Sequence, residues 1–250
     1  MLFNRHRRNL HLARAHYMQV KHNNNVLISP LIMELQERLI DIRVPFQTGL
    51  WHGQKFINEG GSFVNGQLIF CDDADIDCLV QSVDLAVSFL KMHWLENIPG
   101  YLDLMHTKLG ENGLFLGVMW GGETLFELRD ALIQTEAQVW GSGSARVAPM
   151  VSAHDMAALM QKSPFYEPVV DVMTFTVTYN HLADLVRDLR IMGETEALMT
   201  RNPRYCGKAF WREAEQYLLG QYKVVGNEQR FKITFQALFM LGWKKPTRAF

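Results

Sequence analysis

The stretch SVDLAVSFLKMHWLENIPGYLDLMHTKLGENGLFLGVMWGGETL, from Ser82 to Leu125, decides the fold of this chain. Its nearly continuous apolar runs, Val83–Leu90 and Leu114–Trp120, predict two strands that are covered on both faces. Between them, Pro99–Leu109 has apolar residues at helical spacing and predicts a helix. A strand, a helix and a strand of this length form one βαβ unit, so we expect the two strands to be parallel.

Two ring side chains follow the first of these strands. In an open parallel sheet, ligands bind at the carboxyl ends of the strands, and His93 and Trp94 stand just beyond that end. A histidine there is able to act as a general base, and a tryptophan is able to form the wall of a pocket. The alternative is structural, with Trp94 anchoring the helix that follows.

The same stretch belongs to a pattern that runs along most of the chain. S-x-D-L-x-V-S-x-L-x-x-H-W is followed by the helix and by G-L-F-L-G-x-x-x-G-G-E-T-L-x-E-L-R. Further parts are the opening FNRHRRNLHLARA, then ARVAPMVSAHDMAALMQKSPF, LVRDLRIMGETEAL and ITFQALFMLGW. The pattern resembles one branch of the class I S-adenosylmethionine (SAM) methyltransferases. That branch holds the biotin-pathway malonyl-carrier-protein O-methyltransferase and the complex I assembly factor whose mitochondrial members act as an arginine hydroxylase, and the resemblance is stronger to the second group.

The resemblance implies a Rossmann-like α/β fold, a doubly wound, mostly parallel sheet with a late antiparallel strand. We expect one domain over residues 1–250 with a helical insertion at about 123–165. Val169–Tyr179 alternates like an antiparallel edge strand, and Arg230–Trp243 is the expected final strand. The segment from Pro45 to Asp84 is too short for the family's full N-terminal part, because each βαβ unit takes roughly 30 residues. The N-terminal part is therefore expected to be shortened.

Polar residues stand at the start of two further predicted helices. Thr124 or Glu123 is expected to cap the helix Glu123–Val139, and Asn180 to cap the helix His181–Met192. A side-chain oxygen at such a position accepts a hydrogen bond from a backbone N–H of the first helical turn. The sequence thus predicts that each helix carries its own cap.

The family's cofactor motif is not recognisable in this chain. A SAM methyltransferase of this type has a turn D-L-G-x-G-x-G after its first strand, and the equivalent text here is QTGLWHGQK. Gly49 and Gly53 remain as candidate cofactor-binding residues, but Trp51 and His52 occupy the tight part of the turn. The alternative is that both glycines only serve turns. SAM is the one cofactor that the resemblance implies, and its binding is expected to be weakened or lost.

An acidic pair supplies the other candidate cofactor residues. The short predicted strand Gln67–Phe70 leads into Asp72 and Asp73, and the family carries an acidic pair after its third strand, beside the adenine. The alternative is a solvated turn that is rich in acids.

The resemblance places five residues in the substrate region, without assigning catalysis to any of them: His93, Trp94, Arg146, Tyr179 and Arg187. Arg146 would hold an acidic substrate or a carboxylate of the fold, and the alternative is a surface salt bridge. Arg187 and Arg190, three residues apart on one helix, would jointly hold an anion. The alternative for this pair is a solvated helix face.

Bulk properties limit the classes of function. The net charge of −1 gives no global attraction to nucleic acid, and no apolar run is long enough to cross a membrane. The three cysteines have no metal-ligand spacing and the nine histidines form no metal motif, so we expect no metal and a reduced, cytoplasmic setting. The basic, acid-free Met1–Arg14 leaves the mitochondrial matrix as an alternative, by way of a transit peptide.

The sequence therefore leads to three functional hypotheses. The first is a SAM-dependent methyltransferase-family protein with weakened or lost SAM binding. The second is a non-catalytic assembly factor or binding module for respiratory complex I, and the third is a malonyl-carrier-protein O-methyltransferase of biotin synthesis. A protein acceptor or an assembly partner is expected in each case, and whether the chain is an enzyme stays open.

Overall fold

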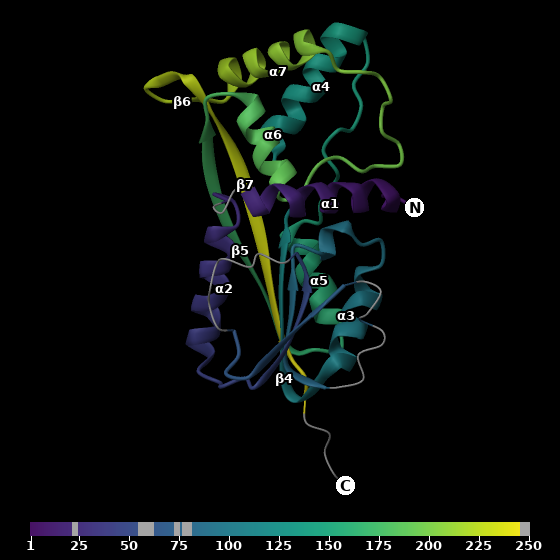
Figure 1. The fold of residues 1–250 in the computed structure, drawn as a ribbon, viewed down its shortest axis with the longest axis vertical. Helices are drawn as coiled ribbons and strands as arrows, with labels where there is room; N and C mark the ends of the chain where they lie inside the picture. The colour runs from purple at the N-terminus through teal and green to yellow at the C-terminus, as the bar shows by residue number, and fades with distance from the viewer. Residues whose placement is uncertain (22–24, 55–62, 73–75, 77–81, 246–250) are drawn as a thin grey trace. The chain divides into compact units, whose positions relative to one another are not determined.

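The computed structural model describes residues 1–21, 25–54, 63–72, 76 and 82–245 (Figure 1). The chain divides into two compact units. The first unit consists of Met1–Leu27, Glu123–Pro149 and Thr174–Phe235, and the second of Ile28–Gly122, Met150–Met173 and Gln236–Phe250. The single domain with an insertion at about 123–165 stays a prediction.

The described residues form both helices and strands. The helices are α1 (Arg5–Lys21), α2 (Ser29–Ile42), α3 (Ile98–Lys108), α4 (Phe126–Trp140), α5 (Ala153–Lys162), α6 (Leu182–Ile191) and α7 (Lys208–Gln221), with a short 3₁₀ helix at Met92–Trp94. The strands are β1 (Thr48–Gly53), β2 (Gln67–Cys71), β3 (Val83–Phe89), β4 (Leu109–Trp120), β5 (Tyr166–Tyr179), β6 (Lys223–Val224) and β7 (Asn227–Trp243). The predicted strand–helix–strand unit is therefore present as β3, α3 and β4.

The strands form a mostly parallel sheet in the order β2-β1-β3-β4-β7-β5. β1 pairs in parallel with β2 and with β3, and β3 pairs in parallel with β4. The late strand β7 runs antiparallel to β4, with Leu114 opposite Trp243 and Trp120 opposite Ala237. β5 lies at the edge of the sheet. These findings confirm the predicted doubly wound sheet with a reversed late strand.

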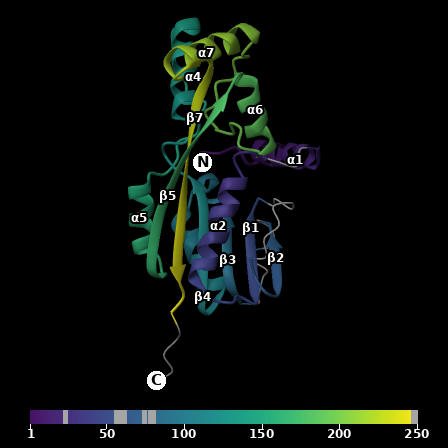
Figure 2. The same cartoon turned by 90° about the vertical axis from the view of Figure 1, so that its left-hand side faces the viewer.

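Helices cover both faces of this sheet in the second unit. α2 lies on one face and α3 and α5 lie on the other (Figures 1 and 2). Since both faces are covered, β3 is buried apart from the half-buried Asp84, and the second half of β4 is buried throughout, as their apolar sequence predicts. α3 begins with its own cap, because the Asn97 side chain accepts a hydrogen bond from the Gly100 amide at 3.0 Å. The Lys244 ammonium binds two carbonyl oxygens at the other end, those of His106 at 3.2 Å and Leu109 at 2.6 Å.

In the first unit, α1 holds the loop that follows α6. The Arg8 guanidinium donates to the Gly193 carbonyl, Arg14 donates to the Thr195 hydroxyl at 2.8 Å, and Gln19 donates to the Ile191 carbonyl at 2.9 Å. Gly193 adopts a left-handed conformation (φ 70°) just past the helix end, where glycine is favoured. The basic N-terminal segment is therefore part of a folded unit, which agrees with its resemblance to the family's opening motif.

The caps predicted for α4 and α6 are wrong. Leu125 stands at the cap position of α4, and its amide donates to the Thr234 carbonyl at 2.9 Å. His181 stands at the cap position of α6, and the Glu215 carboxylate accepts from the Leu182 amide at 2.6 Å. In both helices, a backbone amide at the start of the helix donates to an acceptor from a distant part of the chain. A local side chain was expected to supply the acceptor there.

His11 of α1, which contacts the loop after α6, makes the stability of the first unit depend on pH. Its Nδ1–H donates to the Thr195 carbonyl at 3.2 Å, while burial, helped by the neighbouring Arg14, lowers the pKa of His11 from 6.5 to about 4. The unfolded chain binds this proton below pH 6.5 and the folded chain only near pH 4, so stability is complete above pH 6.5 and falls toward pH 4. We expect the melting temperature to fall between about pH 7 and about pH 5, and to fall less in His11→Asn. Thermal melts followed by circular dichroism measure this. An equally steep fall of the melting temperature with pH in His11→Asn and in the wild-type protein would contradict this assignment.

Candidate functional site

The carboxyl ends of β1, β2 and β3 lie side by side in the second unit. Because β2 pairs directly with β1, Asp72 follows the strand next to the first strand. An acid at that place in a dinucleotide-binding fold faces the ribose hydroxyls. The predicted match of Asp72 to the family's acidic pair beside the adenine stays a prediction. Asp72 is exposed, and Asp73 lies outside the described residues.

The turn after β1 is bonded to β3. Gly53 has a φ of 125°, and a Cβ atom there would lie 2.1 Å from the Phe89 carbonyl oxygen. The Gln54 amide donates to the same oxygen at 3.1 Å, and the Trp51 indole N–H donates to the Gln54 carbonyl at 2.9 Å. Gly53 is thus required by the close approach of the two strands. The Gln54 amide at the start of this turn therefore already has a hydrogen-bond acceptor within the protein.

Gly49 has a different structural role. It is the second residue of β1 and lies inside the strand, not in the turn after it. A Cβ atom at Gly49 would lie 2.8 Å from Leu68 Cδ1 and 2.9 Å from Val64 Cγ1. The missing side chain therefore lets the neighbouring segment pack closely against β1.

Aromatic rings gather around Trp51 at this end of the sheet. The buried indole lies 5.0 Å from the Phe63 ring, 5.2 Å from the Phe89 ring and 6.3 Å from the Phe70 ring, measured between centroids. Successive side chains of a strand point to opposite faces, so this cluster belongs to one face of β1 and His52 to the other.

On the face of His52, three polar side chains form a buried chain of hydrogen bonds. His52 Nδ1 lies 2.7 Å from the Tyr101 hydroxyl, which donates to the Ser88 hydroxyl at 3.0 Å. Tyr101 comes from α3 and Ser88 from β3, and all three side chains are buried. Sequence reasoning did not bring these residues together, because only the pairing of β1 with β3 and the packing of α3 do so. Their mutual bonds satisfy groups that would otherwise be costly to bury.

His93 and Trp94 form the end of the 3₁₀ helix that follows β3. His93 is buried and Trp94 is half-buried, with their ring centroids 5.7 Å apart. The structure therefore puts both residues beyond the carboxyl end of β3. Their role toward a substrate stays a prediction.

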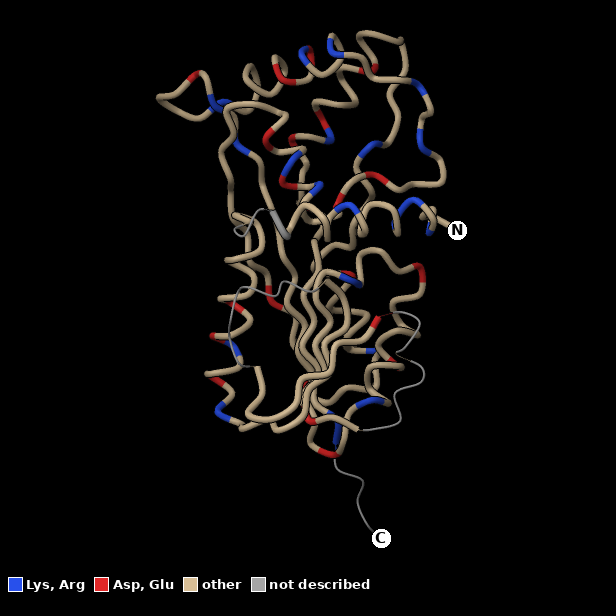
Figure 3. Tube along the Cα trace, in the orientation of Figure 1, with Lys and Arg blue, Asp and Glu red and all other residues tan. Residues whose placement is uncertain are grey.

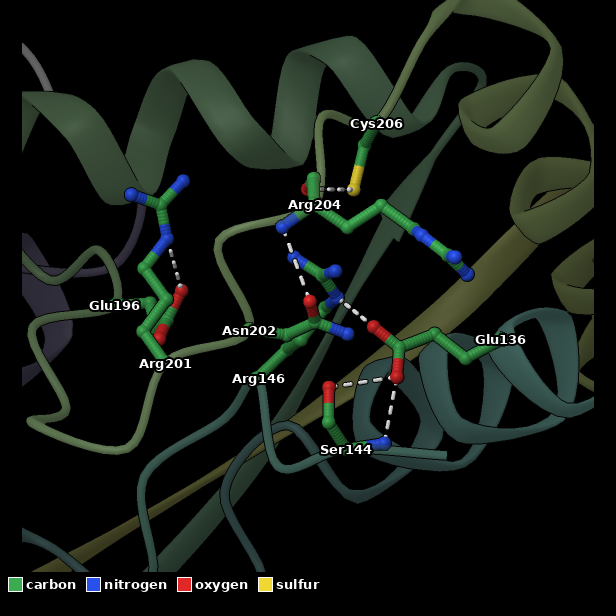
Figure 4. A network of polar contacts seen from close by, with 8 residues as sticks. All are labelled: Glu136, Ser144, Arg146, Glu196, Arg201, Asn202, Arg204 and Cys206. Carbon is green, nitrogen blue, oxygen red and sulfur yellow. Dashed lines mark hydrogen bonds and ion pairs between the residues drawn. The ribbon is translucent and has the colours of Figure 1, made fainter. Parts of the chain in front are cut away.

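In the first unit, Arg146 binds a carboxylate of the fold (Figure 4). Its guanidinium pairs with Glu136, and the exposed fractions of the two side chains are 7% and 0%. The second carboxylate oxygen of Glu136 accepts from the amide and from the hydroxyl of Ser144, both at 2.6 Å. The guanidinium also lies over the Trp140 and Phe210 rings, at 5.6 and 5.5 Å from their centroids. Of the three interpretations of Arg146, the structure shows a buried ion pair.

Tyr179 and Arg187 lie around the start of α6. The Tyr179 hydroxyl donates to the Asp188 carboxylate at 3.1 Å, and burial raises the pKa of the Tyr179 phenol. Arg187 pairs with Asp184 at 2.9 Å on the exposed surface of the same helix. Arg187 therefore already has a carboxylate partner three residues away on its own helix. An anion held jointly with Arg190 is not needed to neutralise its charge.

In the part of the chain that the structure describes, no three histidine, cysteine, aspartate or glutamate side chains are grouped so that they could hold a metal ion. No described helix is both long and apolar enough to span a bilayer.

Sequence comparison gives two kinds of relative. No family model matches the chain. The mitochondrial arginine-hydroxylase NDUFAF5 of Danio rerio is 31% identical over 194 residues, which are 75% of this chain and 57% of that protein. Its counterpart in Dictyostelium discoideum is 34% identical over 65% of this chain and 37% of that protein. The malonyl-[acyl-carrier protein] O-methyltransferase of Gallionella capsiferriformans is 27% identical over 73% of this chain and 60% of that protein. The chain spans about half the length of the curated relatives it matches.

The fold is shared with a solved structure. The YcgJ protein of Bacillus subtilis superposes with a TM-score of 0.50 at 11% identity, over 86% of this chain and 100% of that chain. A SAM-dependent methyltransferase from Archaeoglobus fulgidus aligns over 91% of this chain and 98% of that chain, with a TM-score of 0.43 at 10% identity. The mostly parallel sheet with its reversed late strand agrees with the sequence relatives. The chain belongs to the class I SAM-dependent methyltransferase family, in the branch of the NDUFAF5 arginine-hydroxylases and the malonyl-[acyl-carrier protein] O-methyltransferases.

Proposed function

We propose that this protein acts by binding a protein partner and that its SAM site is weakened or lost. The observation that carries the proposal is the turn after β1, in which the Gln54 amide is bonded to the Phe89 carbonyl. In dinucleotide-binding folds, a glycine-rich turn at this place leaves backbone amides open so that the cofactor can approach them closely. Trp51 and its aromatic neighbours fill one face of the same strand ends.

The residues present do not fit the whole of SAM. Binding a nucleoside needs a cavity lined by apolar groups, with a few polar groups that fix its orientation. Asp72 is suitably placed to accept hydrogen bonds from ribose hydroxyls, but Gly53 is held against β3 and Gly49 is packed inside β1. Among the described residues of these strand ends, one exposed carboxylate and a bonded Gln54 amide support weak binding at most.

A partner-binding role agrees with what the relatives are called. The NDUFAF5 proteins are named as mitochondrial arginine-hydroxylases and the other relatives as malonyl-[acyl-carrier protein] O-methyltransferases, and the second name includes a protein substrate. We propose a role of this kind, as an assembly factor for a respiratory complex. The mitochondrial matrix is the compartment that the first group favours, and the cytoplasm is the alternative.

The test is a calorimetric titration of the purified protein with S-adenosylhomocysteine, the product form of the cofactor. We expect no saturable heat up to millimolar ligand, because the Gln54 amide that begins the turn is bonded to the Phe89 carbonyl and the aromatic cluster occupies the neighbouring face. A micromolar dissociation constant would overturn the proposal. Asp72→Ala is the companion variant, since binding that Asp72→Ala removes would come from the predicted ribose contact.

The second candidate is a SAM-dependent methyltransferase, and Asp72 is the observation that favours it. Its position after the strand next to β1 is the one from which an acid reaches the ribose. This candidate includes the malonyl-carrier-protein O-methyltransferase. It requires micromolar binding in the same titration, so one experiment separates the two candidates.

A further inference from the structure

Two basic segments of the first unit lie together on one surface. The chain has no Asp or Glu before Glu34 and none over residues 197–212. Backbone contacts join the segments, because Phe3 bridges Leu198 and the Met199 amide donates to the Leu2 carbonyl at 2.9 Å. We call Arg5, Arg7, Arg201, Arg204 and Lys208 the basic surface, and Figure 3 shows the lysines and arginines of both segments.

One carboxylate lies among these cations. Glu196 accepts from Arg201 at 3.1 Å, and Arg7 of α1 is close enough to act on the same charge. Within the described residues, the Arg204 guanidinium contacts the Trp140 ring at 5.0 Å and pairs with no acid, and Lys208 is exposed at the first turn of α7. The basic surface therefore carries more positive charge than the fold itself neutralises.

Apolar side chains are exposed beside these cations. Met1, Leu2 and Met199 are all more than two fifths exposed, and Tyr205 is 86% exposed. Arginine, methionine and tyrosine are the residue types that are enriched where proteins bind one another, whereas lysine is depleted there. Four of the five cations are arginines, so the composition is that of a protein interface.

We propose that the basic surface binds an acidic segment of a partner protein. Charge complementarity gives the partner a negative charge, since the two segments themselves contain no acid. The acids at their margin, Glu194 and Glu196, pair with Arg8 and Arg201. Nucleic acid fits less well, because no stack of exposed rings for bases is present among the described residues of this surface. The proposal rests on the proposed function, since it names the chemistry of the partner.

The experiment measures the fluorescence anisotropy of a labelled peptide of about sixteen glutamate, aspartate and leucine residues, a length that forms a helix spanning such a surface. The double variant Arg204→Glu and Lys208→Glu should weaken binding at least about tenfold, because it reverses two cations that have no acidic partner in the described part of the chain. The control is the double variant Lys223→Glu and Lys232→Glu. It changes the net charge by the same amount as the first double variant, at exposed residues elsewhere in the first unit. It should change binding less than about twofold. Circular dichroism checks that both variants are folded.

Three results would overturn the inference. They are failure of the acidic peptide to bind, an equal loss in both double variants, and tighter binding to phosphatidylserine vesicles or to single-stranded RNA than to the peptide. The titration with S-adenosylhomocysteine is a separate measurement on other residues. A negative peptide result therefore leaves the proposed function standing, and micromolar cofactor binding leaves the peptide result interpretable.

Discussion

Glu136→Ala is expected to destabilise the first unit by about 3–5 kcal/mol, the usual cost of removing one partner of a buried ion pair. The alanine would leave the Arg146 guanidinium charged, buried and without its carboxylate. It would also remove the acceptor of two hydrogen bonds from Ser144. Urea unfolding followed by circular dichroism measures the change in the free energy of unfolding.

Asp184→Ala is the matched control for this prediction. It removes the carboxylate partner of Arg187, but this pair lies on the exposed surface, with side chains that are 34% and 54% exposed. Exposed pairs contribute about 0–1 kcal/mol, because water and salt screen them. Equal losses of stability in Glu136→Ala and Asp184→Ala would show that the buried cluster is not the source of stability that the structure indicates.

Gly53→Ala is expected to destabilise the second unit by about 3 kcal/mol or more, since it combines backbone strain with a steric clash. The φ of 125° is rarely adopted by a residue with a side chain, and the new Cβ would lie 2.1 Å from the Phe89 carbonyl oxygen. The strands β1 and β3 would have to separate at their carboxyl ends, which would break the bond between the Gln54 amide and the same oxygen.

The control for Gly53→Ala is Gly110→Ala in β4. A Cβ atom at Gly110 would meet its nearest neighbour at 3.7 Å, and its φ is not positive. We expect this variant to change the free energy of unfolding by less than about 1 kcal/mol. If Gly53→Ala is as stable as Gly110→Ala in urea unfolding, the turn after β1 adopts another conformation. The turn would then be free to take up a cofactor, and the proposed loss of SAM binding would lose its main support.

Much of the fold follows from local pattern. β3 was predicted within one residue of its observed end, and the sheet is mostly parallel with a reversed late strand, as the family pattern implied. Such agreement is expected where a strand is covered on both faces, because continuous apolar sequence has few other stable environments. The candidate site was harder to predict from the sequence. Gly49 and Gly53 have the same sequence signal, but Gly49 lies inside β1 and Gly53 is its last residue, held against Phe89.

The sequence by itself determined the family, the βαβ unit and the charges of each segment. Only the tertiary structure decided that Arg146 meets Glu136, that β2 lies beside β1, and that the turn after β1 is bonded to Phe89. The physical reason is that periodicity and composition act over neighbouring residues, whereas an ion pair, a strand order or a cap supplied from afar depends on which distant groups fold together. Those distant partners therefore decide which groups fill the carboxyl ends of the strands, where the cofactor site lies.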